Sequence, residues 1–467
     1  MKHLSRLWLG VACLTATAGA QAEGLLEVYQ QALQSDPLVR EAEANRLAAG
    51  EAAPQARGNL FPQITASGSY TDQTSDGNNV FTQRTDDGMG NQIVQVITSQ
   101  SERDADDTFW RIELRQTLFR WDQFIALRQA DKRIAQAVAN YEAAQQDLLV
   151  RVSERYFEIL ASQDSLAAAE ASKRAIERQL DQAKQRFDVG LIAITDVQEA
   201  QAAYDQAVAD EIAAKRDLAT AKESLREITD SYIGDLEAPE AGLPLSLPEP
   251  ADADAWVAVA MDQNLALQAS RLNAELAKAE IDSRRSGHFP QVDLFARRSD
   301  FDSDATRDEN NLGAQPADSA QATDEFGIEV SFPIFSGGVT SSRVREAVYQ
   351  HRAAREQLQR IARETERQAR DAYLGVETDI ARVNALSQAL KSSLTALEAT
   401  DAGLEVGTRT TVDVLDAQRN VFNAYTGLER ARYDYLLNVL RLKQAAGILR
   451  VQDLEEIEAF LAFDQEG

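Results

Sequence analysis

Residues 325–335 read EFGIEVSFPIF, and large apolar side chains alternate there with small or polar ones. Alternation with a period of two is typical of a β-strand that has one apolar and one polar face. Three other segments share the pattern: QITASGSY (63–70), WRIELRQTL (110–118) and QVDLFAR (291–297). The sequence therefore predicts four strands, near residues 61–72, 109–120, 289–301 and 325–335.

Most of the remaining chain has a helical pattern. Apolar residues recur every seven positions in two series, Leu127, Ile134, Tyr141, Leu148 and Val383, Leu390, Leu397, Leu404. This spacing forms the seam of a left-handed coiled coil. No proline or glycine interrupts residues 123–188. We predict a long helix over 123–188 followed by a helix from 195, and a second long helix over about 340–405 followed by a helix from 411.

The two halves of the chain repeat each other. NLFPQI at 59–64 matches GHFPQV at 287–292, and VGLIAITDVQEAQ at 189–201 matches VGTRTTVDVLDAQ at 406–418. Each half carries two strands, a long helix and a shorter helix, so the chain is an internal two-fold repeat. We place the first copy at 23–235 and the second at 251–450, with a proline-rich acidic linker at 236–250 and a C-terminal tail at 451–467.

Residues 1–22 have the three-part pattern of a secretory signal peptide. Lys2 and Arg6 flank the start of an apolar run, and small residues follow at Ala20 and Ala22. The only cysteine of the chain, Cys13, lies in this segment, so the mature chain has no thiol for a disulfide, a metal site or a nucleophile. Without Lys2 and Arg6 the formal net charge of −27 becomes −29, which argues against a nucleic-acid partner.

The sequence lacks the common catalytic spacings. HExxH, GxSxG and GxxxxGK do not occur, and one of the three histidines, His3, lies in the predicted signal peptide. We therefore expect no enzymatic activity, no cofactor and no metal site. After Ala22 there is also no apolar run of about 18 residues, the length that a transmembrane helix needs.

The strand pattern favours an outer-membrane sheet. In such a sheet the apolar face contacts lipid, and charged residues such as Arg111, Glu113 and Asp293 face a wet interior. Long polar loops at 71–108 and 302–324 would join the strands of each pair. Four strands cannot close a barrel, so the copies must associate. The alternative is a periplasmic or surface coiled-coil scaffold or adhesin without a pore, in which the strands form a soluble sheet.

Several segments resemble the TolC family of outer-membrane efflux and type I secretion ducts: RFDVGLIAITDVQ, VGTRTTVDVLDAQ, ARYDYLLNVLRLKQAAGIL and the two FPQ strand starts. The resemblance implies a mixed α+β membrane protein of the cell outer membrane, in which three protomers of four strands each form a twelve-stranded β-barrel. A long α-helical coiled-coil tunnel would continue the barrel into the periplasm. A periplasmic adaptor and an inner-membrane transporter of the RND, ABC or MFS type would dock at its far end.

In this family the tunnel is closed at its periplasmic end by glycine-containing turns. The resemblance implies that Asp413 and Asp416 project into this constriction, where three copies form two carboxylate rings that raise one another's pKa and attract cations. Arg409, with Thr195 and Asp196 of the other turn, matches polar links that hold the helices shut. The tip residues that would meet the adaptor are Val189, Gly190, Val406, Gly407 and Thr408.

One gate position departs from the family pattern. The tyrosine that the family places three residues before the VGTRT glycine is Leu404 here, so an apolar side chain of the heptad series replaces one polar link. A simpler interpretation of Asp413 and Asp416 also stays open. Acidic residues are favoured in the first turn of any helix, where Thr410 or Thr411 can act as the cap.

Overall fold

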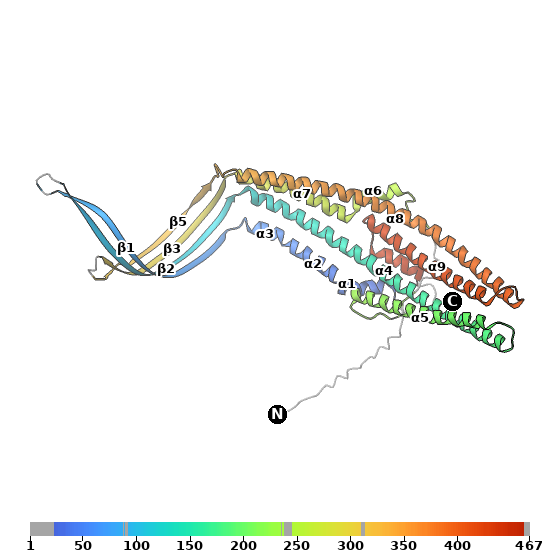
Figure 1. The fold of residues 1–467 in the computed structure, drawn as a ribbon. Helices are drawn as coiled ribbons and strands as arrows, with labels where there is room; N and C mark the ends of the chain where they lie inside the picture. The colour runs from blue at the N-terminus through green and yellow to red at the C-terminus, as the bar shows by residue number, and fades with distance from the viewer. Residues whose placement is uncertain are drawn as a thin grey trace, which may run out of the picture. The chain divides into compact units, whose positions relative to one another are not determined.

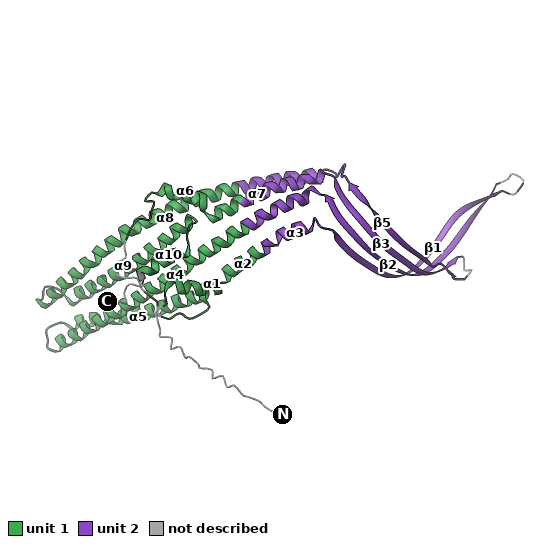
Figure 2. Ribbon diagram, turned by 180° about the vertical axis from the view of Figure 1, so that it is seen from behind, with its two compact units in different colours: residues 1–47, 136–271, 356–467 green, residues 48–135, 272–355 purple. Residues whose placement is uncertain are grey.

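The computed structural model describes residues 23–86, 88, 92–234, 236–237, 245–309 and 313–461. The predicted signal peptide at 1–22, residues 238–244 of the predicted linker and residues 462–467 of the predicted tail lie outside these ranges. The chain divides into two compact units, coloured green and purple in Figure 2. Unit 1 consists of residues up to Leu47, Gln136–Arg271 and residues from Glu356 on, and unit 2 consists of Ala48–Ala135 and Leu272–Arg355.

Two very long helices, each followed by a shorter one, account for most of the helical structure (Figure 1). α4 (Trp121–Asp188) has 68 residues and precedes α5 (Ile194–Thr229). α8 (Val339–Glu405) has 67 residues and precedes α9 (Thr411–Ala445). The shorter helices are α1 (Leu25–Ser35), α2 (Pro37–Gly50), α3 (Ala52–Gly58), α6 (Ala253–Gln263), α7 (Leu265–Arg285), a 3-10 turn η1 (Ser286–His288) and α10 (Val451–Leu461). No helix in the described part of the chain combines the length and apolar character that crossing a membrane requires.

Unit 1 has its main hydrophobic core where α1, α4, α5, α9 and α10 pack together. Its fully buried members include Leu25, Tyr156, Leu160, Leu225, Leu440 and Leu454. The hydroxyl of Tyr156 donates a hydrogen bond to the carbonyl oxygen of Glu237 at 2.7 Å, and Arg151 of α4 forms an ion pair with Asp36 at 2.8 Å. Burial of each large apolar side chain contributes about 1.5–3 kcal/mol, so this core fixes the middle of the helical unit.

The expected C-terminal tail is wrong over its first eleven residues, because these form helix α10. Leu454 and Ile457 of α10 are buried in the core of unit 1, and Lys443 of α9 forms an ion pair with Asp453 at 2.5 Å. Val451, Leu454 and Ile457 are spaced by three residues, which places them on one face of a helix. The segment is short and acidic, and its composition alone therefore resembles that of a solvated tail.

Unit 2 contains an antiparallel sheet. Its strands are β1 (Gln63–Asp86), β2 (Gln92–Phe119), β3 (Gln291–Glu309), β4 (Gln315–Pro316) and β5 (Ser319–Ser331). They follow the order β1, β2, β3, β5, and the two-residue β4 also pairs with β3. The register sets Ala66 opposite Ile112, Leu114 opposite Ala296, and Leu294 opposite Ile328. The alternating apolar residues of the four main strands therefore share one face of the sheet.

The strands are longer than the alternation predicts, and the expected loop at 71–108 is wrong. β1 and β2 continue through it as a hairpin, paired from Thr71 opposite Asp107 to Asp86 opposite Gln92. Similarly, β3 reaches Glu309 and β5 begins at Ser319, inside the loop expected at 302–324. Apolar and polar side chains do not alternate strictly along these extensions, so the period of two is not visible in the sequence. The backbone ladder needs no side-chain pattern, and water can solvate both faces.

Candidate functional site

The turn between α4 and α5 ends the long helix with a glycine. Gly190 has φ +78°, in the left-handed region that glycine adopts without strain. Its N–H donates to the carbonyl of Phe187, and the N–H of Leu191 donates to the carbonyl of Arg186, both at 2.8 Å. These two bonds define the Schellman ending of a helix, which satisfies carbonyls that the helix leaves free.

The turn between α8 and α9 has the same backbone conformation. Gly407 has φ +79°, its N–H donates to the carbonyl of Leu404 at 3.2 Å, and the N–H of Thr408 donates to the carbonyl of Gly403 at 2.8 Å. The N–H of Arg409 adds a third bond, to the same Gly403 carbonyl at 3.2 Å. The repeated VG signal in the sequence thus corresponds to two copies of one turn.

Gly403 allows Arg409 to pack closely over the end of α8. A Cβ atom added to Gly403 would lie 2.6 Å from Cγ of Arg409, closer than nonbonded carbon atoms approach. The corresponding position of the first turn is Arg186, 217 residues earlier, so that turn has no such opening. Sequence reasoning missed Gly403. The signal that could have found it is a glycine in the last turn of an otherwise continuous helix.

Helix α9 begins with a capping box that contains one of the predicted gate residues. The Thr410 side chain accepts a hydrogen bond from the N–H of Asp413 at 3.2 Å, and the Asp413 carboxylate accepts from the N–H of Thr410 at 2.8 Å. Helix α5 begins at Ile194, and the residue before it, Ala193, offers no side-chain cap. The hydrogen bonds from Thr410, with a smaller contribution from the charge of Arg409, lower the pKa of Asp413 below its ordinary value.

Asp416 lies one helical turn beyond Asp413 and forms an ion pair with Arg419 at 2.7 Å. Both side chains are more than half exposed, so the pair contributes little to stability. Within one chain, therefore, both acids have local partners, as the simpler interpretation expects. A raised pKa would require the carboxylates of three chains to approach one another, and it stays a prediction.

The predicted polar links are not formed within the described residues. Thr195 is exposed and Asp196 is partly exposed in the first turn of α5, and no hydrogen bond or ion pair joins either of them to Arg409 there. The Arg409 side chain instead packs over Gly403 and acts electrostatically on Asp413. Links between Arg409 and Thr195 or Asp196 therefore stay a prediction for contacts between copies.

A small apolar contact connects the two helical hairpins in unit 1. Leu415 of α9 is buried against Ile176 of α4 and Ala207 of α5. Nearer the tips, Leu404 lines an open groove of about 440 Å³ whose other walls come from Gln182, Gln185, Arg186, Val189 and Glu405. Sequence reasoning assigned Leu404 to the heptad series but missed the role of Leu415, because their neighbours belong to distant segments.

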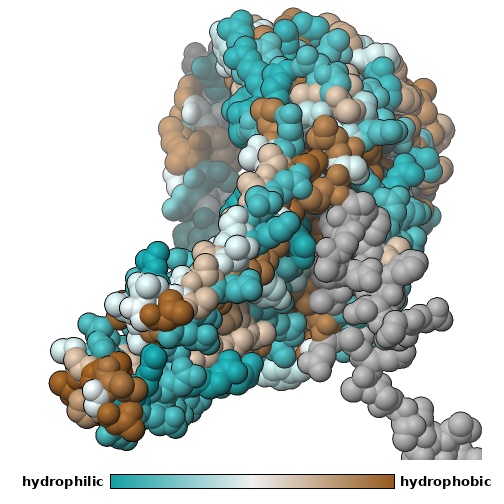
Figure 3. All heavy atoms as spheres, turned by 90° about the vertical axis from the view of Figure 1, so that its right-hand side faces the viewer, coloured by the Kyte–Doolittle hydropathy of each residue, from teal (hydrophilic) through white to brown (hydrophobic). Residues whose placement is uncertain are grey.

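The tips carry exposed apolar side chains. The exposed fractions are 71% for Val189, 72% for Leu191 and 75% for Val406. Each of these residues is adjacent to the glycine of its turn. Figure 3 looks towards this end of the molecule and shows hydrophobic atoms in brown among hydrophilic atoms in teal. A partner that covers exposed apolar side chains of this kind lowers the free energy of the system, because it removes apolar surface from water.

The sheet of unit 2 has two chemically different faces. Its apolar face is open in the single chain, where Phe326 is 88% and Ile328 63% exposed. On the other face Arg115 of β2 contacts three carboxylates, Glu113 at 3.2 Å, Asp293 of β3 at 3.4 Å and Glu329 of β5 at 3.5 Å. This charged network depends on the strand register. The sequence pattern predicts only that these charged residues lie on the polar face.

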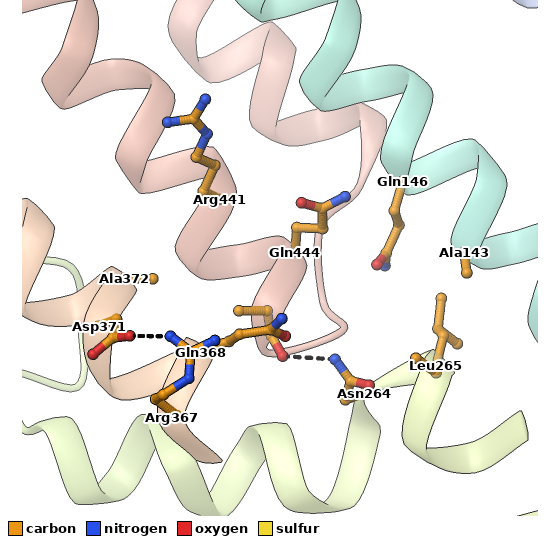
Figure 4. A pocket seen from close by; sticks show the side chains of 12 residues that line it. Ala143, Gln146, Asn264, Leu265, Arg367, Gln368, Asp371, Ala372, Arg441 and Gln444 are labelled. Carbon is orange, nitrogen blue, oxygen red and sulfur yellow. Dashed lines mark hydrogen bonds and ion pairs between the residues drawn. The ribbon is translucent and has the colours of Figure 1, made fainter. Parts of the chain in front are cut away.

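Unit 1 also contains a cavity of about 480 Å³ between α4, α8, α9 and the junction of α6 with α7 (Figure 4). Arg367 and Asp371 form an ion pair at 2.6 Å at its edge, and Asn264 donates to the carbonyl of Ala445 at 3.0 Å. The lining contains neither a nucleophile with an adjacent base nor a histidine. Across the described residues there is no group of three or more side chains suited to hold a metal ion.

Comparison with known proteins gives a consistent result. The profile of the outer membrane efflux protein family matches residues 28–230 and 256–448. Outer membrane protein TolC of Vibrio cholerae serotype O1 is 35% identical over 99% of both chains. Alkaline protease secretion protein AprF of Pseudomonas aeruginosa is 29% identical over 98% of this chain and 92% of that protein. The crystal structure of the outer membrane protein VceC from Vibrio cholerae shares the fold, with a TM-score of 0.68 at 19% identity, over 91% of this chain and 96% of that one.

Proposed function

The chain belongs to the outer membrane efflux protein family, and we propose that it forms a homotrimeric exit duct. It is an outer-membrane protein of a channel family, and this family is not one of enzymes. In the proposed trimer, β1, β2, β3 and β5 of each copy contribute to a twelve-stranded barrel. Helices α4, α5, α8 and α9 form a tunnel in the periplasm.

The observation that carries the proposal is the sheet of unit 2. It exposes a row of large apolar side chains on one face, has the ion-pair network of Arg115 on the other, and leaves β1 and β5 as unpaired edges. Lipid would cover the apolar face, and neighbouring copies would pair with the open edges. Water inside the duct would solvate Arg115 and its three carboxylates.

The proposed entrance lies at the turn between α8 and α9. Three copies of Asp413 and Asp416 would line it and favour cations, while Arg409 would bind Thr195 and Asp196 of an adjacent helix pair and hold it shut. Docking of a periplasmic adaptor on Val189, Gly190, Val406, Gly407 and Thr408 would open it. The exposure of Val189 and Val406 supports a role in docking, because both side chains are uncovered in the single chain.

Two classes of cargo follow from the relatives. The family description indicates efflux, and the name of AprF indicates secretion of an alkaline protease by that protein. We propose that this chain exports small molecules, proteins or both, and that an inner-membrane transporter drives the export.

Reconstitution tests the duct directly. The mature protein is extracted in detergent, its mass is measured by light scattering, and it is inserted into liposomes loaded with potassium salt. We expect a trimer that releases potassium slowly, and faster release when Arg409→Ala removes the proposed lock. A folded protein that is monomeric, or a trimer that leaves the liposomes sealed with and without Arg409→Ala, would favour the scaffold or adhesin without a pore.

A further inference from the structure

The far end of the β1–β2 hairpin is a two-stranded ribbon with which no other strand of the described residues pairs. We define the distal ribbon as residues 79–86 of β1 and 92–99 of β2, which pair from Asn79 opposite Ser99 to Asp86 opposite Gln92. The pairing of β2 with β3 stops at Ser101, so the ribbon lies beyond it. Figure 1 shows the two strands continuing alone past the ends of β3 and β5.

The β2 strand of this ribbon has the composition of a strand that pairs on both edges. It reads QIVQVITS, with five β-branched residues and no charged residue, proline or glycine. Natural proteins protect an exposed edge with lysine, proline or a bulge, and none of these is present here, where the register with β1 is uninterrupted. Closer to the membrane the same strand is strongly charged, at Glu102, Arg103, Asp104, Asp106 and Asp107.

The β1 edge of the ribbon also stays unpaired by β5 when copies associate. β1 has 24 residues and β5 has 13, so in any register at least 24 − 13 = 11 residues of β1 have no counterpart in the β5 of a neighbouring copy. Strand order in a ring of copies is β1, β2, β3, β5 and then the next β1. Beyond the ends of β3 and β5, the next strand that faces β2 is therefore β1 of the neighbouring copy.

We propose that the distal ribbons of three copies pair edge to edge, β2 of one copy with β1 of the next, above the ends of β3 and β5. The directions are compatible, because β2 runs antiparallel to β1 and all copies share one orientation around the axis. Exposed Val80, Val94 and Val96 would then pack with the same side chains of neighbouring ribbons. This inference rests on the proposed trimer and goes beyond its duct function.

The consequence is a narrow outer mouth. Barrel diameter grows roughly linearly with strand number, and about eight strands already leave room only for side chains. A ring of six ribbon strands would therefore be about half as wide as the twelve-stranded part and would close the mouth at rest, so the ribbons would have to separate for cargo to leave. A neighbouring copy is the preferred occupant of the edge because the trimer holds the identical ribbons at high effective concentration.

Distances between identical spin labels at two levels of β2 test this pairing. The predicted mature chain has no cysteine, since Cys13 is the only one, so Val96→Cys and Ile112→Cys each provide one label per copy. The two positions lie 16 residues apart on the same face of β2, one in the distal ribbon and one on the apolar face of the sheet. In detergent-solubilised trimers, we expect the label-to-label distance at residue 96 to be about half that at residue 112.

A charged variant tests whether pairing at the β2 edge causes the short distance at residue 96. Val94→Lys with Gln95→Lys, in the Val96→Cys background, adds positive charges to β2 in every copy, and the distance at residue 96 should then lengthen towards that at residue 112. If the distance at residue 96 in the unmodified ribbon equals or exceeds that at residue 112, the inference is overturned. A defined distance at residue 112 would still support the trimer. Failure of the proposed function itself would instead appear as no defined distance at residue 112.

Discussion

The two helix-ending turns have the same backbone and opposite side-chain chemistry. Gly190 and Gly407 have nearly identical φ angles and the same pattern of backbone hydrogen bonds. The aligned residues after each glycine are Leu191 and Thr408, Ile192 and Arg409, Ala193 and Thr410, and Ile194 and Thr411. The repeat has kept the element that makes a turn and has changed the side chains around it. A shared fold at two places is therefore no evidence for a shared role, because the four residues after the glycine are polar only in the α8–α9 turn.

The largest effect should come from breaking the contact that joins the hairpins. Leu415→Ala removes a buried side chain between Ile176 and Ala207 and should lower the free energy of unfolding of this region by about 2 to 5 kcal/mol. Hydrogen exchange of the amides at the start of α9 measures the change. Leu191→Ala is the matched control, because that leucine is 72% exposed and its removal should change exchange little. Similar effects of the two changes would show that Leu415 does not bind the hairpins together.

Alanine at each turn glycine tests whether the two backbones are equivalent. A Cβ atom at Gly190 or Gly407 would contact nothing within 4 Å, so the cost arises from the left-handed conformation alone. We expect each change to lower the free energy of local opening by about 1–2 kcal/mol, equally in both turns. Hydrogen exchange at the ends of α4 and α8 compares them. A destabilisation confined to one turn would mean that only that turn requires the left-handed conformation at its glycine.

Exchanging the helix caps separates the turns by their side chains. Thr410→Ala removes the capping box of α9 and should destabilise its first turn by about 1 kcal/mol. Ala193→Thr places a cap before α5, where Asp196 already occupies the third position, and should stabilise that turn by about half this amount. Amide exchange in the two first turns reads out both changes. If Thr410→Ala had no effect, the observed capping box would be of no energetic importance.

The smallest expected effect is a dependence of the α9 start on pH. The folded pKa of Asp413 lies below its unfolded value, so its contribution to stability is present above that value and is lost as the pH falls through the folded pKa. With an unfolded aspartate near about pH 3.9, the loss begins below about pH 4. Carbon-13 NMR of the Asp413 carboxyl should give a pKa that rises towards the ordinary value in Thr410→Ala. In a closed trimer, a pKa above the ordinary value would show that the carboxylates of neighbouring copies dominate over the cap.

The sequence predicted those features that local chemistry determines. The heptad series and the lack of proline and glycine correspond to α4, which begins two residues before the expected position, at Trp121. The two VG segments correspond to the turns, because glycine alone adopts the left-handed position without strain. Thr410 was one of two residues weighed as a cap, since an accepting oxygen is needed immediately before the first helical turn.

Other features depend on residues that are distant in sequence. The contact of Leu415 with α4 and α5 and the network of Arg115 with β3 and β5 follow from packing and register, which no local pattern determines. The hairpin beyond Thr71 was missed because its apolar and polar side chains do not alternate strictly, although its backbone is paired along both strands. Helix α10 was missed because Val451, Leu454 and Ile457 alternate with acidic residues.

One measurement tests the difference between the turns most directly. Single-channel reversal potentials in a potassium chloride gradient across a planar bilayer would compare the unmodified protein, Asp413→Asn/Asp416→Asn, and the matched variant Glu199→Gln in the other turn. We predict a cation-selective channel whose selectivity falls in the first variant and is unchanged in the second. Equal loss in both variants, or full selectivity after Asp413→Asn/Asp416→Asn, would contradict the proposal that Asp413 and Asp416 set the cation preference of the entrance.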